Sequence, residues 1–255
     1  MLSEERREII SELLKEFGSV SIKDLSLKFG LSVATIRRDL DMLAGKKLLK
    51  RTFGGAISQK IIKRELNFET KKDVNIEQKK MIALIASKYV EDGDTIFIES
   101  GSTCIQLCFN LSNKNKLTII TNSPDIAIAA NMANKESTIF LTGGLFKSDT
   151  HSLTGHLADE NLKYFNFEKA FIGITAIDLK EGITTVDYQE AYTKKTIIDS
   201  AQKVIGLVDN SKFGKICLNS VCPVSSLDIL ITDDKVSFDA IEKIRQMGVI
   251  VINKI

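Results

Sequence analysis

Short apolar runs typical of buried strands recur through the C-terminal part of the chain, and they constrain its fold more than any other feature. Segments long enough for a helix separate these runs, which cover residues 95–98, 117–120, 138–141, 170–174, 204–208, 228–232 and 249–252. Strands that alternate with helices predict an α/β domain with a largely parallel sheet. Two prolines in 255 residues and the lack of a repeat period argue against a solenoid or a disordered tail.

The first 45 residues show a different pattern, three helical segments in close succession. Ser3 is a candidate cap for the first helix, whose apolar residues recur at three- and four-residue intervals, and Gly18 can end it. Ser21 and Asp24 resemble a capping box that opens a second, shorter helix, with Gly30 as its stop. The spacing predicts a small helical domain before the α/β domain.

The third helix carries two adjacent arginines close to its apolar stripe. At 100° per residue, an arc of about 80° holds the apolar residues Val33, Ile36, Leu40 and Leu43. The outward face of the first turns then consists of Ser32, Ala34, Thr35, Arg37 and Arg38. A short helix, a tight turn and a helix with a basic N-terminal end predict a helix-turn-helix that contacts the DNA major groove. An arginine fork can pair with guanine or with phosphate oxygens.

A basic strand and a glycine pair follow the third helix, as expected for a wing. Gly54-Gly55 predicts a hairpin turn, with Lys50 and Arg51 available to DNA phosphates. Residues 1–65 contain 14 Lys and Arg against 9 Asp and Glu, whereas the other residues contain 21 against 24. A basic head on a mildly acidic body indicates nucleic-acid contact at one end. The alternative is that these charges form a solvated face of a small helical domain.

Small and polar residues follow several of the predicted strands, at the sheet edge where α/β domains bind ligands. They are Ser100, Gly101, Ser102 and Thr103, then Asn122, Gly143, Gly144, Asp187, Glu190 and Lys212. Backbone N–H groups and hydroxyls in the first turn would favour a phosphate. Each turn alone is equally compatible with an ordinary loop. Together they favour a pocket for a sugar phosphate.

Two groups of motifs resemble a known family. The run S-x-x-T-I-R-R-D-L from Ser32, followed by R-x-F-G-G-A from Arg51, is similar to the winged helix of DeoR-type bacterial transcription regulators. The body resembles the effector domain of the same family through D-G-D-T-I-F-I-E-S-G-S-T, T-N-S, L-T-G-G, G-I-T-T-x-D-x-x-E-A and D-N-S-K-F-G. Three positions depart from the usual residues: Phe53 replaces His, Glu99 replaces Asp, and Ser102 replaces Thr.

The resemblance implies an architecture and a set of roles. Residues 1–57 would form the winged helix-turn-helix. Residues 58–74 are polar and charged without clear periodicity, which by itself indicates a linker. Residues 75–255 would form an effector domain related to ribose-5-phosphate isomerase and coenzyme A transferases. By match, the turn from Ser100 to Thr103 would hold the phosphate and Lys212 would neutralise it. The sugar hydroxyls would face Asn122, Asp187 and Glu190.

We therefore expect a cytoplasmic DNA-binding regulator, a repressor of a sugar-metabolism operon that a phosphorylated sugar releases. Its expected partners are double-stranded operator DNA, the sugar phosphate and at least one further copy of the chain, without a membrane. We expect no catalytic residues, cofactor or metal. The alternatives are a sugar-phosphate isomerase with a DNA-binding appendage, an architectural DNA protein, and a metal site built from Cys104, Cys108, His151 and His156.

Overall fold

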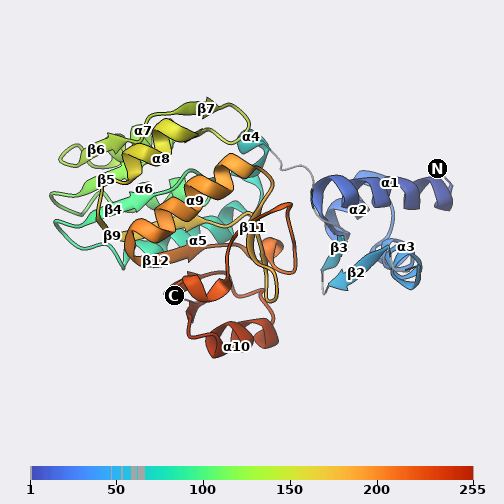
Figure 1. The fold of residues 1–255 in the computed structure, drawn as a ribbon. Helices are drawn as coiled ribbons and strands as arrows, with labels where there is room; N and C mark the ends of the chain where they lie inside the picture. The colour runs from blue at the N-terminus through green and yellow to red at the C-terminus, as the bar shows by residue number, and fades with distance from the viewer. Residues whose placement is uncertain (1, 47, 53, 59–61, 63–66, 255) are drawn as a thin grey trace.

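A small N-terminal head and a larger body divide the chain (Figure 1). The computed structural model describes residues 2–254 apart from 47, 53, 59–61 and 63–66. The head consists of α1 (Ser3–Phe17), β1 (Ser19–Ser21), α2 (Ile22–Phe29), α3 (Val33–Gly45), β2 (Leu49–Thr52) and β3 (Gly55–Ser58). The strands form an antiparallel sheet in the order β1-β3-β2. The predicted helix-turn-helix and wing are confirmed, and β1 is a strand that the sequence pattern did not indicate.

Local capping explains where the head helices begin and end. The Ser21 hydroxyl accepts hydrogen bonds from the backbone N–H groups of Lys23 and Asp24 at the start of α2. The Ser32 hydroxyl accepts one from the Thr35 N–H at the start of α3. One predicted cap is wrong: Ser3 lies inside α1, and the cap position is the preceding residue.

The apolar stripes of the three head helices meet in one core. The fully buried side chains include Ile10, Ile36 and Leu40. Val33, which we placed on the same stripe, is 44% exposed instead. It is the first residue of α3 and lines a shallow hollow beside α2, next to the exposed Leu27.

A buried ion pair joins the first and third helices. The guanidinium Nε of Arg6 donates to Asp39 Oδ2 at 2.6 Å, and both side chains are less than a tenth exposed. Arg7 Nε lies 3.7 Å from the other oxygen of the same carboxylate. Asp39 therefore belongs to the helix packing and not to the DNA-facing side of α3.

The body is a three-layer α/β domain. Its parallel sheet has seven strands in the order β15-β14-β12-β9-β4-β5-β6. Their bounds are β4 (Thr95–Ile98), β5 (Thr118–Thr121), β6 (Thr138–Leu141), β9 (Phe167–Gly173), β12 (Ala201–Leu207), β14 (Ile229–Ile231) and β15 (Ile250–Ile252). Each strand overlaps one of the seven predicted runs, which confirms the predicted fold class.

Helices cover both faces of this sheet. One apolar cluster joins the sheet to α5 (Ile76–Ser87), α6 (Cys104–Cys108) and α7 (Pro124–Ala133). A second cluster joins the other face to α8 (His156–Leu162), α9 (Tyr188–Ser200) and α10 (Phe238–Gln246). Two antiparallel additions were not predicted. One is the hairpin of β7 (Leu145–Lys147) and β8 (Ser152–Thr154), and the other is the small sheet of β10 (Ala176–Asp178), β11 (Gly182–Thr185) and β13 (Asn219–Cys222).

The order in which the chain adds strands to the sheet reverses direction at the centre of the sheet. The chain proceeds from β4 outward to β6, and it then returns to the other side of β4 with β9. The connections leaving β4 and β9 therefore diverge at their carboxyl ends. In open α/β sheets such a topological switch point forms a crevice that binds ligands.

The segment between head and body contains structure of its own. A short helix, α4 (Phe68–Asp73), lies against the body, where the Phe68 ring stacks on His151 with centroids 4.7 Å apart. Nearer the head, the Ile62 N–H donates to the Ile216 carbonyl at 2.9 Å. A Cβ at Gly18, which ends α1 with φ 69°, would overlap the Ile62 side chain. Ile62 thus contacts both units.

Of the helices that the structure describes, none is long and apolar enough to cross a membrane.

Candidate DNA-binding surface and effector pocket

The first turns of α3 present an open, basic surface. Arg37 and Arg38 are both exposed, and neither guanidinium group makes a hydrogen bond to any residue that the structure describes. Ser32 and Ala34 are exposed beside them, whereas Thr35 is half-buried and its hydroxyl lies 3.0 Å from that of Ser32. The structure therefore places these five predicted residues together at one end of α3. Two guanidinium groups there are available for base edges or phosphates.

The basic side chain described in the wing is less available to DNA than the two arginines of α3. Arg51 on β2 forms an ion pair with Asp41 of α3, with 3.2 Å between Nε and Oδ1. Its Nη1 atom is buried and has no hydrogen-bond partner among the described residues. A phosphate contact by Arg51 would therefore compete with this pair. Lys50 lies in the same strand, but its side chain is outside the described residues, and so is Phe53.

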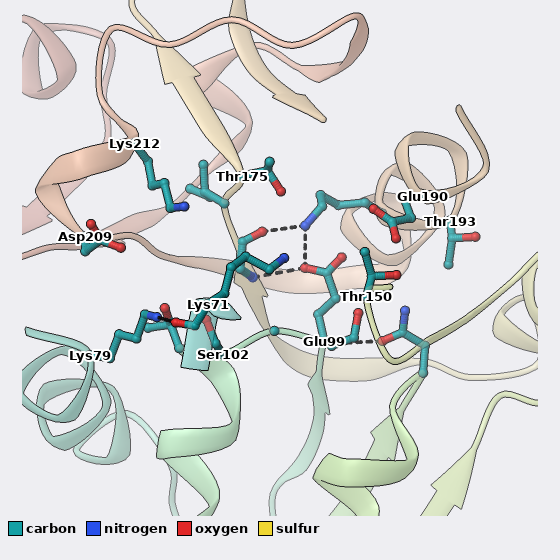
Figure 2. A pocket seen from close by; sticks show the side chains of 17 residues that line it. Lys71, Lys79, Glu99, Ser102, Thr150, Thr175, Glu190, Thr193, Asp209 and Lys212 are labelled. Carbon is teal, nitrogen blue, oxygen red and sulfur yellow. Dashed lines mark hydrogen bonds and ion pairs between the residues drawn. The ribbon is translucent and has the colours of Figure 1, made fainter. Parts of the chain in front are cut away.

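A pocket in the body opens at the carboxyl ends of β4 and β9 (Figure 2). The structure brings together residues from eight separate stretches of the chain, which the sheet topology places side by side. They are Lys71, Lys79, Glu99, Ser100, Gly101, Ser102, Thr103, Asn122, Thr150, Gly173, Ile174, Thr175, Glu190, Thr193, Lys194, Asp209 and Lys212.

One wall of this pocket is the turn that follows β4. The Ser100 N–H donates to Asn122 Oδ1 at 2.8 Å, which anchors the turn to the end of β5. Within the described part of the chain, the N–H groups of Gly101, Ser102 and Thr103 have no acceptor. Adjacent unpaired N–H groups favour an anion. The helix that follows is only five residues long, so its dipole contributes less than the sequence suggested.

Lysines from three elements surround this turn. Lys71 comes from α4, Lys79 from α5, and Lys212 from the short 3-10 helix Asn210–Lys212 after β12. The Lys79 ammonium donates to the Lys71 carbonyl, which fixes α4 to α5 at the pocket wall. Burial lowers the pKa of Lys79 to about 8, against the opposing effect of Asp209. An anion in the pocket would raise the pKa of Lys79 again.

A buried ion pair forms the floor of the pocket. Lys194 Nζ lies 2.6 Å from Glu99 Oε2, and both side chains are 6% exposed. The same carboxylate oxygen accepts from the Gly173 N–H at 3.0 Å, and the ammonium also donates to the Gly173 carbonyl. Burial would by itself lower the pKa of Lys194, but the Glu99 carboxylate raises it above its ordinary value. This pair ties β4, β9 and α9 together at the switch point.

Hydroxyl and carboxylate groups line the side opposite the lysines. The Ser152 hydroxyl donates to Glu190 Oε1 at 3.3 Å, and it lies 2.8 Å from the hydroxyl of Thr150. Glu190 comes from α9 and Thr150 from the β7–β8 hairpin. The pocket therefore has a cationic, N–H-rich side and a side suited to hydroxyl groups.

The structure places most, but not all, of the predicted effector residues in the pocket. Seven of them line it: Ser100, Gly101, Ser102, Thr103, Asn122, Glu190 and Lys212. Asp187 lies outside the lining, where it caps α9 through the Glu190 N–H and forms an ion pair with Lys147. Gly143 and Gly144 also lie outside it. A Cβ on Gly144 would collide with α8, at 2.9 Å from Ala158, so this glycine permits close packing.

Sequence reasoning missed several lining residues. Lys79 was detectable, because it shares a helical stripe with the buried Ile82 and Ala86 and is itself buried. Lys194 follows Glu190 by one turn of α9, so the same face carries both. Lys71 lies in a run of charged residues that reads as a linker, and only the packing of α4 places it in the pocket.

The cysteines and histidines considered for a metal have other roles. Among the described residues, no three His, Cys, Asp or Glu side chains form a group suited to a metal ion. Burial raises the pKa of the Cys108 thiol to about 12 and raises that of Cys104 as well. His151 pairs with Asp125 at 2.6 Å and stacks on Phe68.

Comparisons with known proteins agree with this two-part organisation. Residues 6–61 match the family model of the DeoR-like helix-turn-helix domain, and residues 74–234 match that of the DeoR C terminal sensor domain. The HTH-type transcriptional regulator GlpR of Haloferax volcanii is 32% identical over 99% of this chain and 98% of its own length. The lactose phosphotransferase system repressor of Streptococcus mutans is 34% identical over 91% and 93%.

A second named repressor and an enzyme of known structure are also similar to this chain. The putative aga operon transcriptional repressor of Escherichia coli O157:H7 is 30% identical over 97% of this chain and 93% of its own length. Among solved structures, ribose 5-phosphate isomerase from Plasmodium falciparum is 21% identical, with a TM-score of 0.39 over 54% of this chain and 52% of that chain. With both domain models matched in order and relatives of this identity along nearly the whole chain, the protein belongs to the DeoR family of transcriptional regulators.

Proposed function

We propose that this protein represses a sugar-metabolism operon by binding operator DNA through α3 and the wing, and that a phosphorylated sugar in the body pocket releases it. The observation that carries the proposal is one chain holding both an exposed arginine pair on α3 and a pocket rich in N–H groups and lysines. Relatives named as the lactose phosphotransferase system repressor and the aga operon repressor support the repressor role. The protein would act in the cytoplasm, with the DNA.

The two sides of the pocket suggest how the ligand is oriented. The phosphate group would lie against Gly101 to Thr103, where unpaired N–H groups can donate to it, with Lys79 and Lys212 supplying charge. The sugar hydroxyls would then face Glu190 and Thr150 on the opposite side. A carboxylate there suits hydroxyl donors and disfavours a second phosphate.

An isomerase function is the alternative, because carboxylates and lysines together can transfer protons between adjacent carbons. The geometry argues against it. The Glu99 carboxylate is engaged by both Lys194 and the Gly173 N–H, so it is poorly placed to act as a general base. Incubating the protein with pentose and hexose phosphates and assaying for the isomeric product tests this point. We expect no turnover above a buffer blank.

The regulatory proposal is tested by operator titrations of Lys212→Ala against the wild type. A thermal-shift screen of pentose and hexose phosphates first identifies the tightest ligand. Losing one charge-assisted hydrogen bond should cost about 1.5–3 kcal/mol, or roughly tenfold to a hundredfold in ligand affinity. Lys212→Ala should therefore keep the wild-type affinity for operator DNA without ligand, yet stay bound at ligand concentrations that release the wild type.

Lys180→Ala is the matched control, because Lys180 is an exposed lysine of the body outside the pocket. It should release DNA as the wild type does. Equal release by Lys212→Ala and the wild type would mean that Lys212 does not hold the ligand, and the pocket assignment would be wrong.

A further inference from the structure

The strand β6 leaves one edge of the seven-stranded sheet open. It bonds to β5 on one side only, where the Thr138 N–H donates to Leu117 and the Thr142 N–H to Thr121. Backbone groups alternate in direction along a strand, so those of Ile139 and Leu141 point away from the sheet. Within the described residues these outward groups have no hydrogen-bond partner.

Apolar side chains flank this open edge on both faces of the sheet. Phe140 is 43% exposed and contacts Phe165 on one face, with ring centroids 5.5 Å apart. Leu141, which is 48% exposed, points to the opposite face, the side of α7. There α7 adds the exposed Ile128 and Met132, which are one turn apart. The strand itself, TIFL, has no charge and no proline.

The opposite edge of the same sheet is protected. Ile250 and Ile252 of β15 hydrogen-bond toward β14, so the groups of Val251 point outward. Arg245 of α10 donates to the Val251 carbonyl at 3.2 Å and caps this edge. A guanidinium on the edge is one of the devices by which proteins prevent strands from pairing with other chains. At β6 the described residues provide no such group.

We infer that β6 is the interface with a second copy of this chain, in which the two β6 strands pair antiparallel about a twofold axis. An occupant of this edge must offer a free strand edge with apolar side chains on both of its faces, and another copy offers the same surface. The outward groups of Ile139 would exchange both hydrogen bonds with Leu141 of the partner subunit. Phe140 would then face its own counterpart as the non-hydrogen-bonded pair at the axis.

This arrangement continues the sheet from one body into the other. It also relates the two heads by the same twofold axis, which suits an operator with two half-sites. That last point rests on the proposed function, whereas the strand pairing does not.

Cross-linking through Phe140→Cys tests the pairing directly. The Cα atoms of a non-hydrogen-bonded antiparallel pair lie about 4.5 Å apart, within the range of a disulfide. Mild oxidation should convert nearly all of the Phe140→Cys protein to a covalent dimer on a non-reducing gel. The four native cysteines are buried and should not contribute. The matched control is Ile250→Cys, since Ile250 is 59% exposed on the other edge strand. Absence of the dimer, or equal cross-linking in both variants, would overturn the inference.

A charge at the axis supplies an independent measurement. Phe140→Glu places two carboxylates opposite each other in the pair, and like charges at this position oppose pairing. Sedimentation at micromolar concentration should give a dimer for the wild type and for Ile250→Glu, but a monomer for Phe140→Glu. If Phe140→Glu does not fold, as judged by circular dichroism, the disulfide result decides.

A Phe140→Glu protein that folds and remains dimeric would refute the interface while leaving the DNA-binding proposal intact. Conversely, cross-linking of Phe140→Cys as expected, combined with a wild-type chain that binds no DNA, would refute the proposed function alone.

Discussion

Arg38 is the residue whose loss should most directly reveal base reading. It is exposed on α3, opposite the buried Ile36, and its guanidinium group makes no hydrogen bond to the described residues. If it donates to a base edge, Arg38→Ala should weaken operator binding by about 1–3 kcal/mol and relax the preference at one base position. Binding-site selection followed by anisotropy at physiological salt measures both effects. Lys195→Ala removes one exposed cation from the body and should leave operator affinity unchanged. Unchanged affinity in Arg38→Ala would contradict the predicted contact.

Lys79 should make ligand binding depend on pH. Its pKa in the free protein is about 8, because burial disfavours the ammonium. A phosphate dianion beside it favours the charged form and raises that pKa, so binding takes up a proton at a pH between the free and bound values. Below about pH 8 the proton is already present on Lys79, so the affinity for the sugar phosphate is constant. Above about pH 8 this affinity falls as the pH rises.

Isothermal titration from pH 7 to 9.5 measures this dependence, and buffers of different ionisation enthalpy report the proton uptake. Lys79→Arg is the matched variant, because a guanidinium stays charged throughout this range. Its binding should vary less with pH than that of the wild type. A wild-type affinity that is flat between pH 8 and 9.5 would mean that Lys79 does not face the phosphate.

At the scale of elements, the head should be sensitive to the loss of either partner of the ion pair between α1 and α3. Removing one partner of a buried pair leaves an uncompensated charge and typically costs about 3–5 kcal/mol. Asp39→Ala should therefore lower the thermal transition of the head and abolish operator binding at 37 °C, because Arg6 stays buried. Asp41→Ala is the control on the same helix. Its side chain is 65% exposed, and its pair with Arg51 should contribute about 1 kcal/mol or less.

The short helix α4 should carry the ligand signal toward the head. It contributes Lys71 to the pocket, and it is held to the body by the stacking of Phe68 on His151 and by the Phe68 N–H bond to Asp149 at 2.7 Å. Phe68→Ala removes the buried ring, so α4 should be less firmly placed. We expect unchanged operator affinity without ligand and a several-fold higher ligand concentration for release. Phe109→Ala, at an exposed phenylalanine of the body, should behave as the wild type. Identical release curves for Phe68→Ala and the wild type would exclude α4 from the coupling.

These elements also show how far the sequence alone could lead. Period and capping predicted α2, α3 and the seven parallel strands, because each is specified by its own residues and one buried face. The strand β1 has only three residues, and it exists because β3 offers it a partner. Helix α4 is similar: five of its six side chains are polar, and Phe68 is the one that is apolar and buried. Contacts distant in sequence determine such elements, so local patterns do not reveal them.

The same distinction applies to the pocket. The turn from Ser100 to Thr103 and the residues Asn122, Glu190 and Lys212 follow strands or begin helices, so the rule that ligands bind at strand ends was sufficient to find them. That rule also selected Gly144 and Asp187, which serve packing and helix capping instead. Position relative to a strand indicates the right edge of the sheet, but it does not indicate which side chains face the cavity.

At the scale of the whole molecule, the pocket and the DNA surface should be coupled in both directions. Ile62 contacts α1 through Gly18 and the body through Ile216, so a change in the body can reach the head along the backbone. If the sugar phosphate changes the affinity for operator DNA by a given factor, operator DNA must change the affinity for the sugar phosphate by the same factor. We expect both factors to be of the order of 5- to 150-fold, the range of most allosteric couplings. Anisotropy of labelled operator with and without saturating ligand gives the first factor, and calorimetry of the ligand with and without saturating operator gives the second. A scrambled duplex should leave ligand affinity unaltered. Two factors of one would show that the sugar phosphate does not regulate DNA binding.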